Sequence, residues 1–585
     1  MDNLNLISNY DRACVESNEI DKLIVERLKE GENFRVEAGA GSGKTYSLNK
    51  VIEWIQSNKS DYYLAQKQKV VCITYTNAAV DVINERLSSD SKKFITASTI
   101  HTFAWESIKQ YQKNIIEIIK NNEQYYPKDG DVNQIKKVEY TLGHRYIADD
   151  TLFLYHDDVI ALFVTILDNK KFRKIFSSKY PLILIDEYQD SFESIINKFI
   201  EHFISKKTGP QFGFFGDSWQ TIYQSQKACG LIEHDNIIEI KKPSNFRSAP
   251  KIVNLLNKIR PELPQQSAVD LYEGEVVIIN CNDYSGSRRE DRNFKGDLPI
   301  DELKNRLDSV KSIIKENIIG KDETMKTLMI THKTLASQQG YEAILNVLGD
   351  SFKEKEDSIL VFLLDKVEEV YASLLTTNSK KLFEVLKVSS YPILQKSMKK
   401  QWNELFKTLD EARKKKAIDV IKVIIESNLI PIPNEVNNIY LQYLKNPNES
   451  YNENATIKEY LDIRYCEFIS AMNYFYPETD YSTDHGVKGE EYDNVIFTIT
   501  KGWYNYQFEV YAPMILNGIQ KGKESSYIRN RNLFYVCCSR AKRRLFIFVS
   551  LKVDSQFEQF LKYISENQYY TYSDFIEKYK NQNNY

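Results

Sequence analysis

The side chains with the clearest chemistry lie in one glycine-rich stretch near the N-terminus. A strand-like run at residues 34–38 leads into Ala-Gly-Ala-Gly-Ser-Gly-Lys-Thr, and a helical pattern follows. This order is typical of a loop that binds nucleotide phosphates, because its glycines let backbone N–H groups converge on the anion. Lys44 is expected to contact the β- and γ-phosphates, and Thr45 to hold Mg²⁺. Taken alone, the stretch could also be a glycine-rich turn. The expected nucleotide-binding residues are Ala38, Gly39, Ala40, Gly41, Ser42, Gly43, Lys44 and Thr45.

Two adjacent acids supply the second half of such a site. Asp186 and Glu187 close the apolar run at residues 181–187, where two carboxylates are costly without a cation or another partner. Asp186 suits a ligand of Mg²⁺, and Glu187 suits a base that polarises the attacking water. The alternative is an aspartate that caps a helix after the strand. Together with the glycine-rich loop, the two acids predict hydrolysis of a nucleoside triphosphate, with ATP and Mg²⁺ as the expected ligands.

The elements that must position these residues read as an α/β fold. Short continuous apolar runs alternate with helical patterns, which indicates parallel strands buried on both faces. Residues 105–165 and 345–475 break this rhythm and read as successive helices, so we expect two α/β cores, each with a helical insertion. The expected first core is residues 1–104 and 166–249, and the second is residues 250–344 and 476–585. The polar end of the chain is expected to fray. The runs lie at residues 69–76, 181–187, 212–217, 275–280, 327–332, 494–500 and 544–550.

Composition narrows the class of protein without identifying it. The chain has 585 residues, a net charge of −3, and no apolar run that approaches the ~18 residues of a membrane span. Seven dispersed cysteines show no metal-ligand spacing, which favours reduced thiols and a cytoplasmic protein that does not contact membranes. Nucleic acid would need local basic faces, for which residues 396–416 and 529–544 are candidates. The first of these regions could equally be a solvated helix face.

Eight stretches, taken in order, resemble the motifs of one family. The sequence is similar to superfamily 1A DNA helicases of the UvrD/Rep/PcrA type, and the match spans nearly the whole chain. The resemblance implies two tandem RecA-like P-loop domains that hydrolyse ATP at their interface and grip single-stranded DNA. The stretches are ITYTNAAVDVINERL (73–87), STIHTF (98–103), YHDDVI (155–160), IDEYQDS (185–191), GDSWQTIYQ (216–224), SNFRSAP (244–250), STDHGVKGEEYDNVIF (482–497) and LFYVCCSRAKRRL (533–545).

The resemblance assigns roles around the nucleotide. Arg247 and Arg540 match arginines that reach the γ-phosphate, and such a finger contributes ~10³–10⁵ in rate. Gln220 matches a residue that senses the γ-phosphate or positions water. Phe246 matches an aromatic that stacks on adenine, and Glu491 matches a ribose contact. The alternatives are surface salt bridges for the arginines, core packing for Phe246 and a strand-edge acid for Glu491.

The resemblance also assigns a groove for single-stranded DNA. Its aromatics could stack on bases at ~1–3 kcal/mol per base without reading sequence, and its hydroxyl and amide groups could bond phosphates. The alternative is that an aromatic in a strand-end loop is simply packed. The matching positions are Tyr75, Thr76, Asn77, His101, Thr102, Phe103, Tyr223, Thr483 and His485.

Some features depart from the family pattern. No glutamine precedes Gln56, although the family reads adenine with an upstream glutamine, so selection of adenine is left open. Residues 224–228 replace a second aromatic and an R-G-A sequence that usually follow Tyr223. The insertions are short and no fused nuclease is expected, and in this the sequence resembles compact UvrD-like subunits of anti-phage systems such as Gabija, whose partner is an OLD-family nuclease.

Three functions remain in competition at this level. The first is a 3′→5′ DNA helicase or translocase, which all the core motifs favour. The second is a nucleotide-gated sensor of DNA ends or single strands that activates a partner nuclease without processive unwinding. The third, a small-molecule kinase or another P-loop enzyme, explains Lys44 and Asp186 but none of the later motifs. Strand-displacement assays separate the first two.

Overall fold

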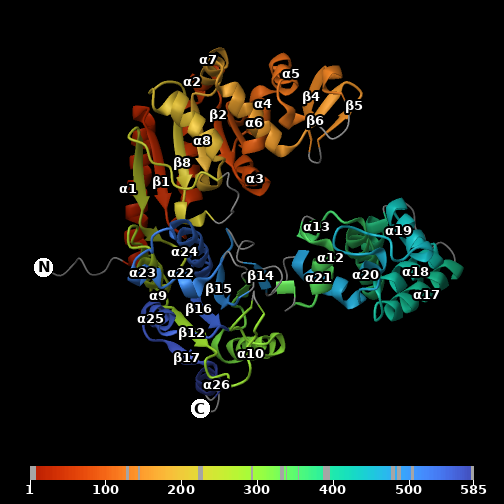
Figure 1. The fold of residues 1–585 in the computed structure, drawn as a ribbon. Helices are drawn as coiled ribbons and strands as arrows, with labels where there is room; N and C mark the ends of the chain where they lie inside the picture. The colour runs from red at the N-terminus through yellow and green to blue at the C-terminus, as the bar shows by residue number, and fades with distance from the viewer. Residues whose placement is uncertain are drawn as a thin grey trace.

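Two parallel sheets organise the chain, one in each half of the molecule (Figure 1). The computed structural model describes residues 8–126, 131–141, 145–221, 228–291, 294–329, 335–336, 339–353, 355–386, 396–475, 481–483, 489–501 and 506–580. We call the first sheet with its helices the first core, and the second sheet with its helices the second core. The predicted α/β fold with parallel sheets is confirmed.

The first sheet has six strands in the order β3-β2-β7-β8-β1-β9, all parallel. Its central strands are buried along their whole length, so their sequences are continuous apolar runs rather than alternating ones. Because the strands are parallel, their carboxyl ends meet at one edge, and the glycine-rich loop and the acids lie there together. The strands are β1 (Asn33–Ala38), β2 (Val70–Thr74), β3 (Ile95–Thr99), β7 (Leu182–Asp186), β8 (Gln211–Gly216) and β9 (Ile237–Lys242).

Helices connect these strands and cover the faces of the first sheet. Threonines cap the N-termini of two of these helices. Thr76 accepts a hydrogen bond from the N–H of Ala79, and Thr99 accepts one from the N–H of Thr102. These caps fix how the chain turns from each strand into its helix. The helices are α1 (Asn9–Glu30), α2 (Lys44–Ala65), α3 (Asn77–Arg86), α4 (Ile100–Ile108), α7 (Lys170–Lys179) and α8 (Glu193–Phe199).

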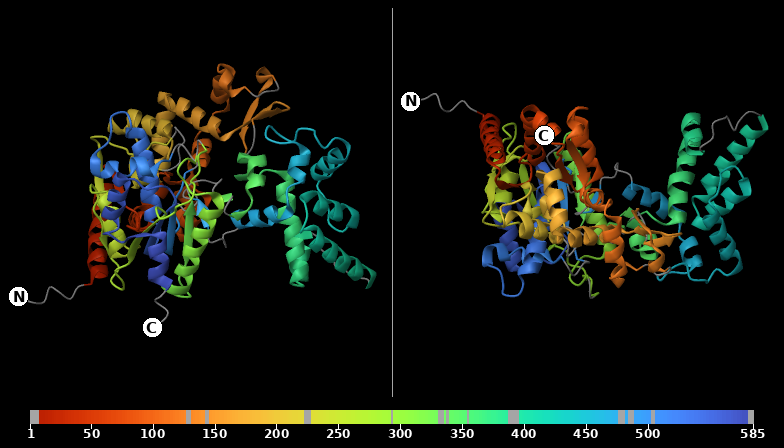
Figure 2. Two further views of the ribbon diagram at one scale, coloured as in Figure 1. Left: turned by 60° about the horizontal axis from the view of Figure 1, so that its bottom comes forward. Right: turned by 90° about the horizontal axis from the view of Figure 1, so that it is seen from above.

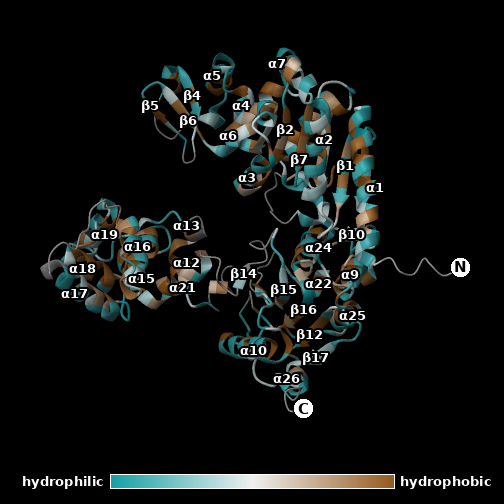
Figure 3. Ribbon diagram, turned by 180° about the vertical axis from the view of Figure 1, so that it is seen from behind, coloured by the Kyte–Doolittle hydropathy of each residue, from teal (hydrophilic) through white to brown (hydrophobic). Residues whose placement is uncertain are grey.

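The second sheet also has six parallel strands, in the order β14-β13-β15-β16-β12-β17. Successive residues of β12 belong to different apolar clusters: Val276 and Ile278 to one, Val277 and Ile279 to the other. Both faces of the sheet are therefore buried, as the apolar strands show in Figure 3. The strands are β12 (Glu275–Asn280), β13 (Met325–Met329), β14 (Tyr481–Thr483), β15 (Tyr492–Ile499), β16 (Ala541–Val549) and β17 (Tyr569–Thr571).

The helices of the second core include one, α24, that lies between the two sheets (Figure 1). The end of the chain does not fray as a whole: β17 joins the sheet and α26 buries Phe575 and Tyr579 beside it. The helices are α9 (Pro250–Ile259), α10 (Ile300–Ile313), α22 (Phe508–Tyr511), α23 (Met514–Asn517), α24 (Glu524–Cys538), α25 (Ser555–Ile564) and α26 (Tyr572–Lys580). None of the helices in the described ranges combines the length and the apolar character needed to cross a membrane.

The first insertion is not wholly helical. Residues 105–165 were expected to form helices only, but they also contain a three-stranded sheet in the order β4-β6-β5. These strands are only three or four residues long, which is too short for a clear alternating pattern in the sequence. The elements are α5 (Gln112–Lys120), β4 (Lys137–Tyr140), β5 (Tyr146–Ala148), β6 (Thr151–Leu154) and α6 (His156–Leu167).

The second insertion is helical throughout its described part and projects from the second core between β13 and β14 (Figure 2). A buried ion pair ties its helices together, because Arg413 donates to Glu368 through Nε at 2.9 Å and Nη2 at 2.7 Å. The helices are α12 (Glu342–Leu348), α13 (Asp350–Lys353), α14 (Ser358–Val361), α15 (Glu369–Leu375), α16 (Ser379–Leu386), α17 (Lys396–Ala412), α18 (Ala417–Ser427), α19 (Asn434–Lys445), α20 (Ile457–Leu461) and α21 (Tyr465–Phe475).

Candidate nucleotide site between the two cores

The glycine-rich loop joins β1 to α2 and has the backbone that its sequence demands. Gly41 and Gly43 have φ of 73° and 78°, in the left-handed region that favours glycine. Gly41 is also crowded, since a Cβ atom there would lie 2.6 Å from Oδ1 of Asn245 and 2.7 Å from Cβ of Arg247. The loop is thus packed directly against the segment that leads into the second core. Its Ser42 is buried, whereas Thr45 lies exposed in the first turn of α2.

Lys44 points from the start of α2 toward the two acids at the end of β7. Its Nζ lies 3.5 Å from the Glu187 carboxylate. Burial by itself lowers the pKa of Lys44, but Glu187, Asp217 and Asp186 outweigh burial and the pKa is raised. The ammonium group is therefore held charged in a buried position, as a phosphate ligand must be.

Asp186 and Glu187 lie in different environments. Burial, reinforced by the Glu187 carboxylate, raises the pKa of Asp186 to about 7. A carboxylate in such a place favours an added cation, so Asp186 fits the predicted role of Mg²⁺ ligand. Glu187 has φ of 49° and ψ of 46°, a left-handed conformation that is costly for a non-glycine residue and is often found at functional sites. Gln189 fixes it there by donating to Oε2 at 2.6 Å.

A buried charge network joins the cores beneath the loop. Arg260, at the end of α9, donates to Asp217 through Nη1 at 2.7 Å and to Glu37 through Nη2 at 2.8 Å. Glu37 also accepts from the Tyr188 hydroxyl at 2.6 Å and from the Ser218 hydroxyl at 2.7 Å. Glu37 thus connects the strand before the loop, the acids and the turn after β8, and Arg260 attaches the second core to all three.

One face of α24 contacts the first core at several points. The Tyr535 hydroxyl accepts a hydrogen bond from the N–H of Ala40 in the loop at 3.0 Å. The Asn532 amide donates to the carbonyl of Thr221 at 3.2 Å, and the Arg531 guanidinium lies 3.5 Å from the centre of the Trp219 ring. The second core therefore touches both the phosphate loop and the turn that carries Gln220.

Arg540 follows α24 and reaches the site from the second core. It is 1% exposed, and its Nη2 lies 3.4 Å from Oε1 of Gln220. Gln220 itself donates to Asp217 at 2.8 Å. Burial lowers the pKa of Arg540 to about 10, so the guanidinium keeps its charge at neutral pH. The structure brings together these two predicted residues, which are far apart in sequence.

Arg247 and Glu491, both predicted at the nucleotide, form an ion pair with each other. The Nε of Arg247 lies 2.7 Å from Glu491, and Nζ of Lys542 lies 3.1 Å from the same carboxylate. The N–H of Phe246 donates to the Gly41 carbonyl at 2.9 Å, which places Phe246 beside the phosphate loop. The ring of Tyr10 lies edge-on to Phe246, with centroids 6.2 Å apart.

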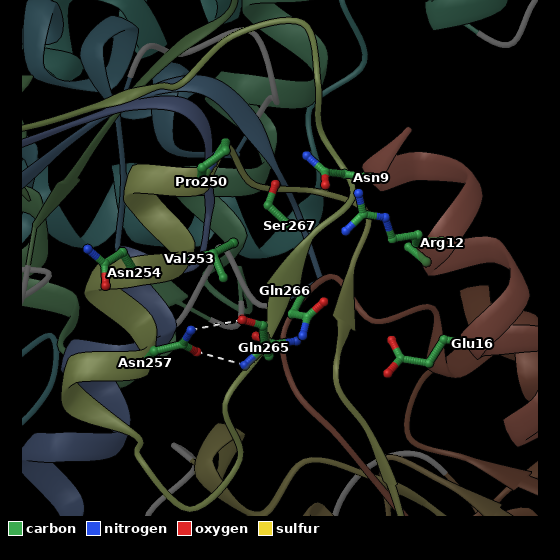
Figure 4. Close-up of a pocket in the computed structure, with 11 residues that line it drawn as sticks. Asn9, Arg12, Glu16, Pro250, Val253, Asn254, Asn257, Gln265, Gln266 and Ser267 are labelled. Atoms are coloured by element: carbon green, nitrogen blue, oxygen red, sulfur yellow. Dashed lines mark hydrogen bonds between the residues drawn. The ribbon is translucent and has the colours of Figure 1, made fainter. Parts of the chain in front are cut away.

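A polar pocket of about 490 Å³ lies behind the loop, between α1, α9 and β11 (Gln266–Ser267) (Figure 4). Asn257 fixes the backbone of Gln265 here, accepting from its N–H at 2.7 Å and donating to its carbonyl at 2.8 Å. The Gln265 side chain then donates to the carbonyl of Ala40 at 3.1 Å. The Gln265 side chain also leaves no room for a side chain at Gly39, because a Cβ atom on residue 39 would lie 2.6 Å from the Gln265 side chain.

The predicted DNA-contact residues lie in different parts of the structure. Tyr75 is 47% exposed at the start of α3, and Thr76, Asn77, His101 and Thr102 lie beside it at the carboxyl edge of the first sheet, on α3 and α4. Thr483 belongs to β14, but Tyr223 and His485 lie outside the described residues.

Phe103 does not belong with this group. It is 3% exposed and packs edge-on against Phe163, Phe176 and Tyr180, so its placement in the DNA groove is corrected here. The reason is its position on α4, where Phe103 faces the apolar interior of the first core and Thr102 faces the surface.

Sequence reasoning missed the residues that hold the site together across the cores. One of them left a signal, because Glu37 and Arg35 lie in the strand before the loop, and a buried charge there must have a partner. The others carry no local signal, since their role depends on which distant segments meet. The missed residues are Tyr10, Glu37, Asp217, Trp219, Arg260, Gln265, Arg531 and Tyr535.

Comparison with known proteins agrees with this architecture. A family model described as an AAA domain matches residues 21–226. Gabija protein GajB of Bacillus cereus strain HuB5-5 is 24% identical over 670 residues, covering 89% of this chain and 93% of that protein. The ATP-dependent DNA helicase Rep of Buchnera aphidicola subsp. Baizongia pistaciae is 26% identical over 274 residues, covering 38% of this chain and 40% of that protein. The mitochondrial ATP-dependent DNA helicase HMI1 of Saccharomyces cerevisiae is 25% identical over 309 residues, covering 44% of this chain and 42% of that protein. These matches support the resemblance drawn from the motifs: the chain is similar to Rep-type DNA helicases and to Gabija protein GajB, and its residues 21–226 match an AAA domain.

Proposed function

We propose that the chain is an ATP-dependent DNA helicase or translocase that hydrolyses ATP between its two cores and moves 3′→5′ on single-stranded DNA. One observation carries the proposal: Arg540 of the second core lies 3.4 Å from Gln220, in the same site as Lys44 and the acids of the first core. A P-loop enzyme whose nucleotide site lies within a single core does not require a buried arginine from a second core. The helicase names of the relatives support the same conclusion.

The residues of the first core would bind and activate the nucleotide. The backbone of the glycine-rich loop and Lys44 would hold the phosphates, and Glu187 would orient the attacking water and accept its proton. Thr45 and Asp186 are the residues that would hold Mg²⁺. The bound Mg²⁺ would supply positive charge to the phosphate oxygens as negative charge develops on them.

The residues of the second core would make turnover depend on contact between the cores. Arg540 lies beside Gln220, where it would stabilise charge on the γ-phosphate during transfer. Arg247 is paired with Glu491 and would exchange this partner for a phosphate when the nucleotide binds. Opening the interface would withdraw Arg540 from the first core and separate Arg247 from Glu491, which would couple hydrolysis to movement of the cores.

The exposed residues near the start of α3 and α4 would form part of the DNA track. Tyr75 would stack on a base, the partly buried His101 would line the groove, and Thr76, Asn77 and Thr102 would contact phosphates. This type of contact reads no sequence, as a translocase requires. The seven cysteines are all free thiols, which supports a reducing, cytoplasmic location.

A second candidate is a nucleotide-gated DNA sensor that activates a partner nuclease, for which an OLD-family enzyme is proposed. The observation that favours it is the contact between the cores, where Arg260 and its two carboxylates are buried. Such a closed interface suits a switch better than a motor that must open at each step. The likeness to Gabija protein GajB over most of the chain supports a defence role for either candidate.

ATP turnover by the purified chain tests both candidates. It should be measured without DNA, with single-stranded DNA and with blunt duplex, followed by strand displacement on a duplex with a 3′ single-stranded tail. Strong stimulation by single strands together with unwinding supports the motor. Stimulation without unwinding supports the sensor. If neither DNA changes turnover or binds to the chain, the proposal of a DNA-dependent ATPase is refuted.

A further inference from the structure

Trp219 of the first core is enclosed by side chains of the second. It lies in a short 3₁₀ turn, Ser218–Gln220, directly after β8, and is 6% exposed. The guanidinium carbons of Arg531 and Arg260 lie 3.5 and 5.1 Å from its ring centroid. The ring of Tyr535 meets it edge-on, with centroids 5.6 Å apart. We call Arg260, Arg531 and Tyr535 the tryptophan cage.

The cage places two cations on one indole in a dry environment, where a cation–π contact is stronger than at the surface. Arg260 is paired directly with carboxylates. Burial lowers the pKa of Arg531 to about 10, although Tyr527, Glu262 and Asp217 act to raise it, and its guanidinium donates to the Asn532 amide oxygen at 2.9 Å. The aromatic face nearest to this charge is the Trp219 ring, at 3.5 Å, whereas Tyr527 lies at 5.8 Å. A residue of the first core thus holds a partly buried cation of α24 in place.

The cage also sets the position of the neighbouring Gln220. The Asn532 amide donates to the Thr221 carbonyl at 3.2 Å, just beyond Gln220, while Trp219 is held just before it. The helix α24, which carries Asn532 and two of the cage residues, Arg531 and Tyr535, ends next to Arg540, whose Nη2 lies 3.4 Å from Gln220. Moving α24 along the turn would separate Gln220 from Arg540.

We propose that Trp219 is a positioning residue that fixes the register of α24 on the turn after β8, so that Gln220 and Arg540 meet the same phosphate. This inference rests on the proposed ATP hydrolysis. It assigns to Trp219 an effect on the rate of turnover, and none on the affinity for nucleotide, which the loop and Lys44 provide. A tryptophan that only filled the core would instead affect stability.

Steady-state ATP turnover of Trp219→Ala, Trp219→Phe and Arg531→Lys tests the proposal. Misplacement of catalytic groups by about 1 Å costs roughly 100-fold, so Trp219→Ala should lower kcat by about that factor with KM nearly unchanged. Trp219→Phe keeps a ring for Arg531 and should recover most of the loss. Arg531→Lys keeps the charge but loses the planar stack, and should lower kcat about tenfold. Trp54→Ala is the matched control, because Trp54 also contacts a cation, Lys29 at 5.5 Å, but lies on the first core away from the site.

Tryptophan fluorescence supplies a readout that does not depend on turnover. The chain has five tryptophans, so the contribution of Trp219 is obtained as the difference between wild type and Trp219→Phe. Binding of a non-hydrolysable ATP analogue with Mg²⁺ should change this contribution, and Arg531→Ala should abolish the change. Wild-type kcat in Trp219→Ala, or an emission change that persists in Trp219→Phe, would overturn the inference. If wild type hydrolyses no ATP, the proposed function fails, whereas the emission change still decides whether the cage responds to nucleotide.

Discussion

Replacing Arg260 by methionine tests whether the two cores are joined by a desolvated charge network. Arg260 is 3% exposed, and it bridges Glu37 at 2.8 Å and Asp217 at 2.7 Å, both of which are buried. Removing one partner of a buried ion pair costs about 3–5 kcal/mol, because it leaves an uncompensated charge. Here two carboxylates lose their shared cation, so we expect a loss of about 5 kcal/mol, at the upper end of that range. For a cooperative unit of about 200 residues this lowers the melting temperature by roughly 10–20 °C.

Differential scanning calorimetry of Arg260→Met beside wild type measures this loss. Lys93→Met is the matched control, because Lys93 and Asp90 form an ion pair whose side chains are 64% and 83% exposed and whose removal should leave the melting temperature unchanged. Adding Glu37→Gln to Arg260→Met should restore part of the stability, since it removes one of the two stranded charges. An Arg260→Met variant that melts together with wild type would refute the argument that the network is desolvated.

Five further substitutions test the site and its correction. Lys44→Ala and Glu187→Gln should abolish ATP turnover, measured by phosphate release, while the fold seen by circular dichroism is retained. Arg540→Ala should bind a fluorescent ATP analogue normally but lose ~10³–10⁵ in turnover, and normal turnover would mean that the second core does not complete the site. Tyr75→Ala should weaken single-stranded DNA binding by ~1–3 kcal/mol, or roughly 5–150-fold in fluorescence anisotropy. Phe103→Ala should instead lower the free energy of unfolding by about 3–5 kcal/mol, and an effect on DNA affinity alone would restore Phe103 to the groove.

The strands at the centre of each sheet could be predicted, and those at the edges mostly could not. The runs predicted at residues 181–187, 212–217 and 275–280 correspond to β7, β8 and β12, which are buried on both faces and read as continuous apolar sequence. β9 and β17 lie at edges of the sheets and are partly exposed, so their sequences mix polar and apolar residues. Without the constraint of full burial, no apolar run marks them.

The residues proposed for catalysis carry local signals in the sequence, whereas the contacts between the cores carry none. The residues that flank Lys44 and Asp186 in the sequence are enough to suggest a role for each of them. Glu37 and Arg260 are 223 residues apart, and the sequence around either residue does not indicate that the other is its partner. The error at Phe103 was avoidable, because the sequence spaces apolar residues along α4 at helical intervals and Phe103 falls on that buried stripe.

The order of the second sheet has a consequence for how the protein is made. β12 lies between β16 and β17, and these begin only at Ala541 and Tyr569. At a synthesis rate of roughly 5–20 residues per second, β12 waits on the order of 10–50 s for its first neighbour. During that time both edges of the apolar strand β12 are unpaired on the ribosome. We therefore expect this segment to bind a chaperone during synthesis. Arg540 emerges with the same late segment, so the proposed site between the cores cannot form until the chain has been synthesised past Arg540.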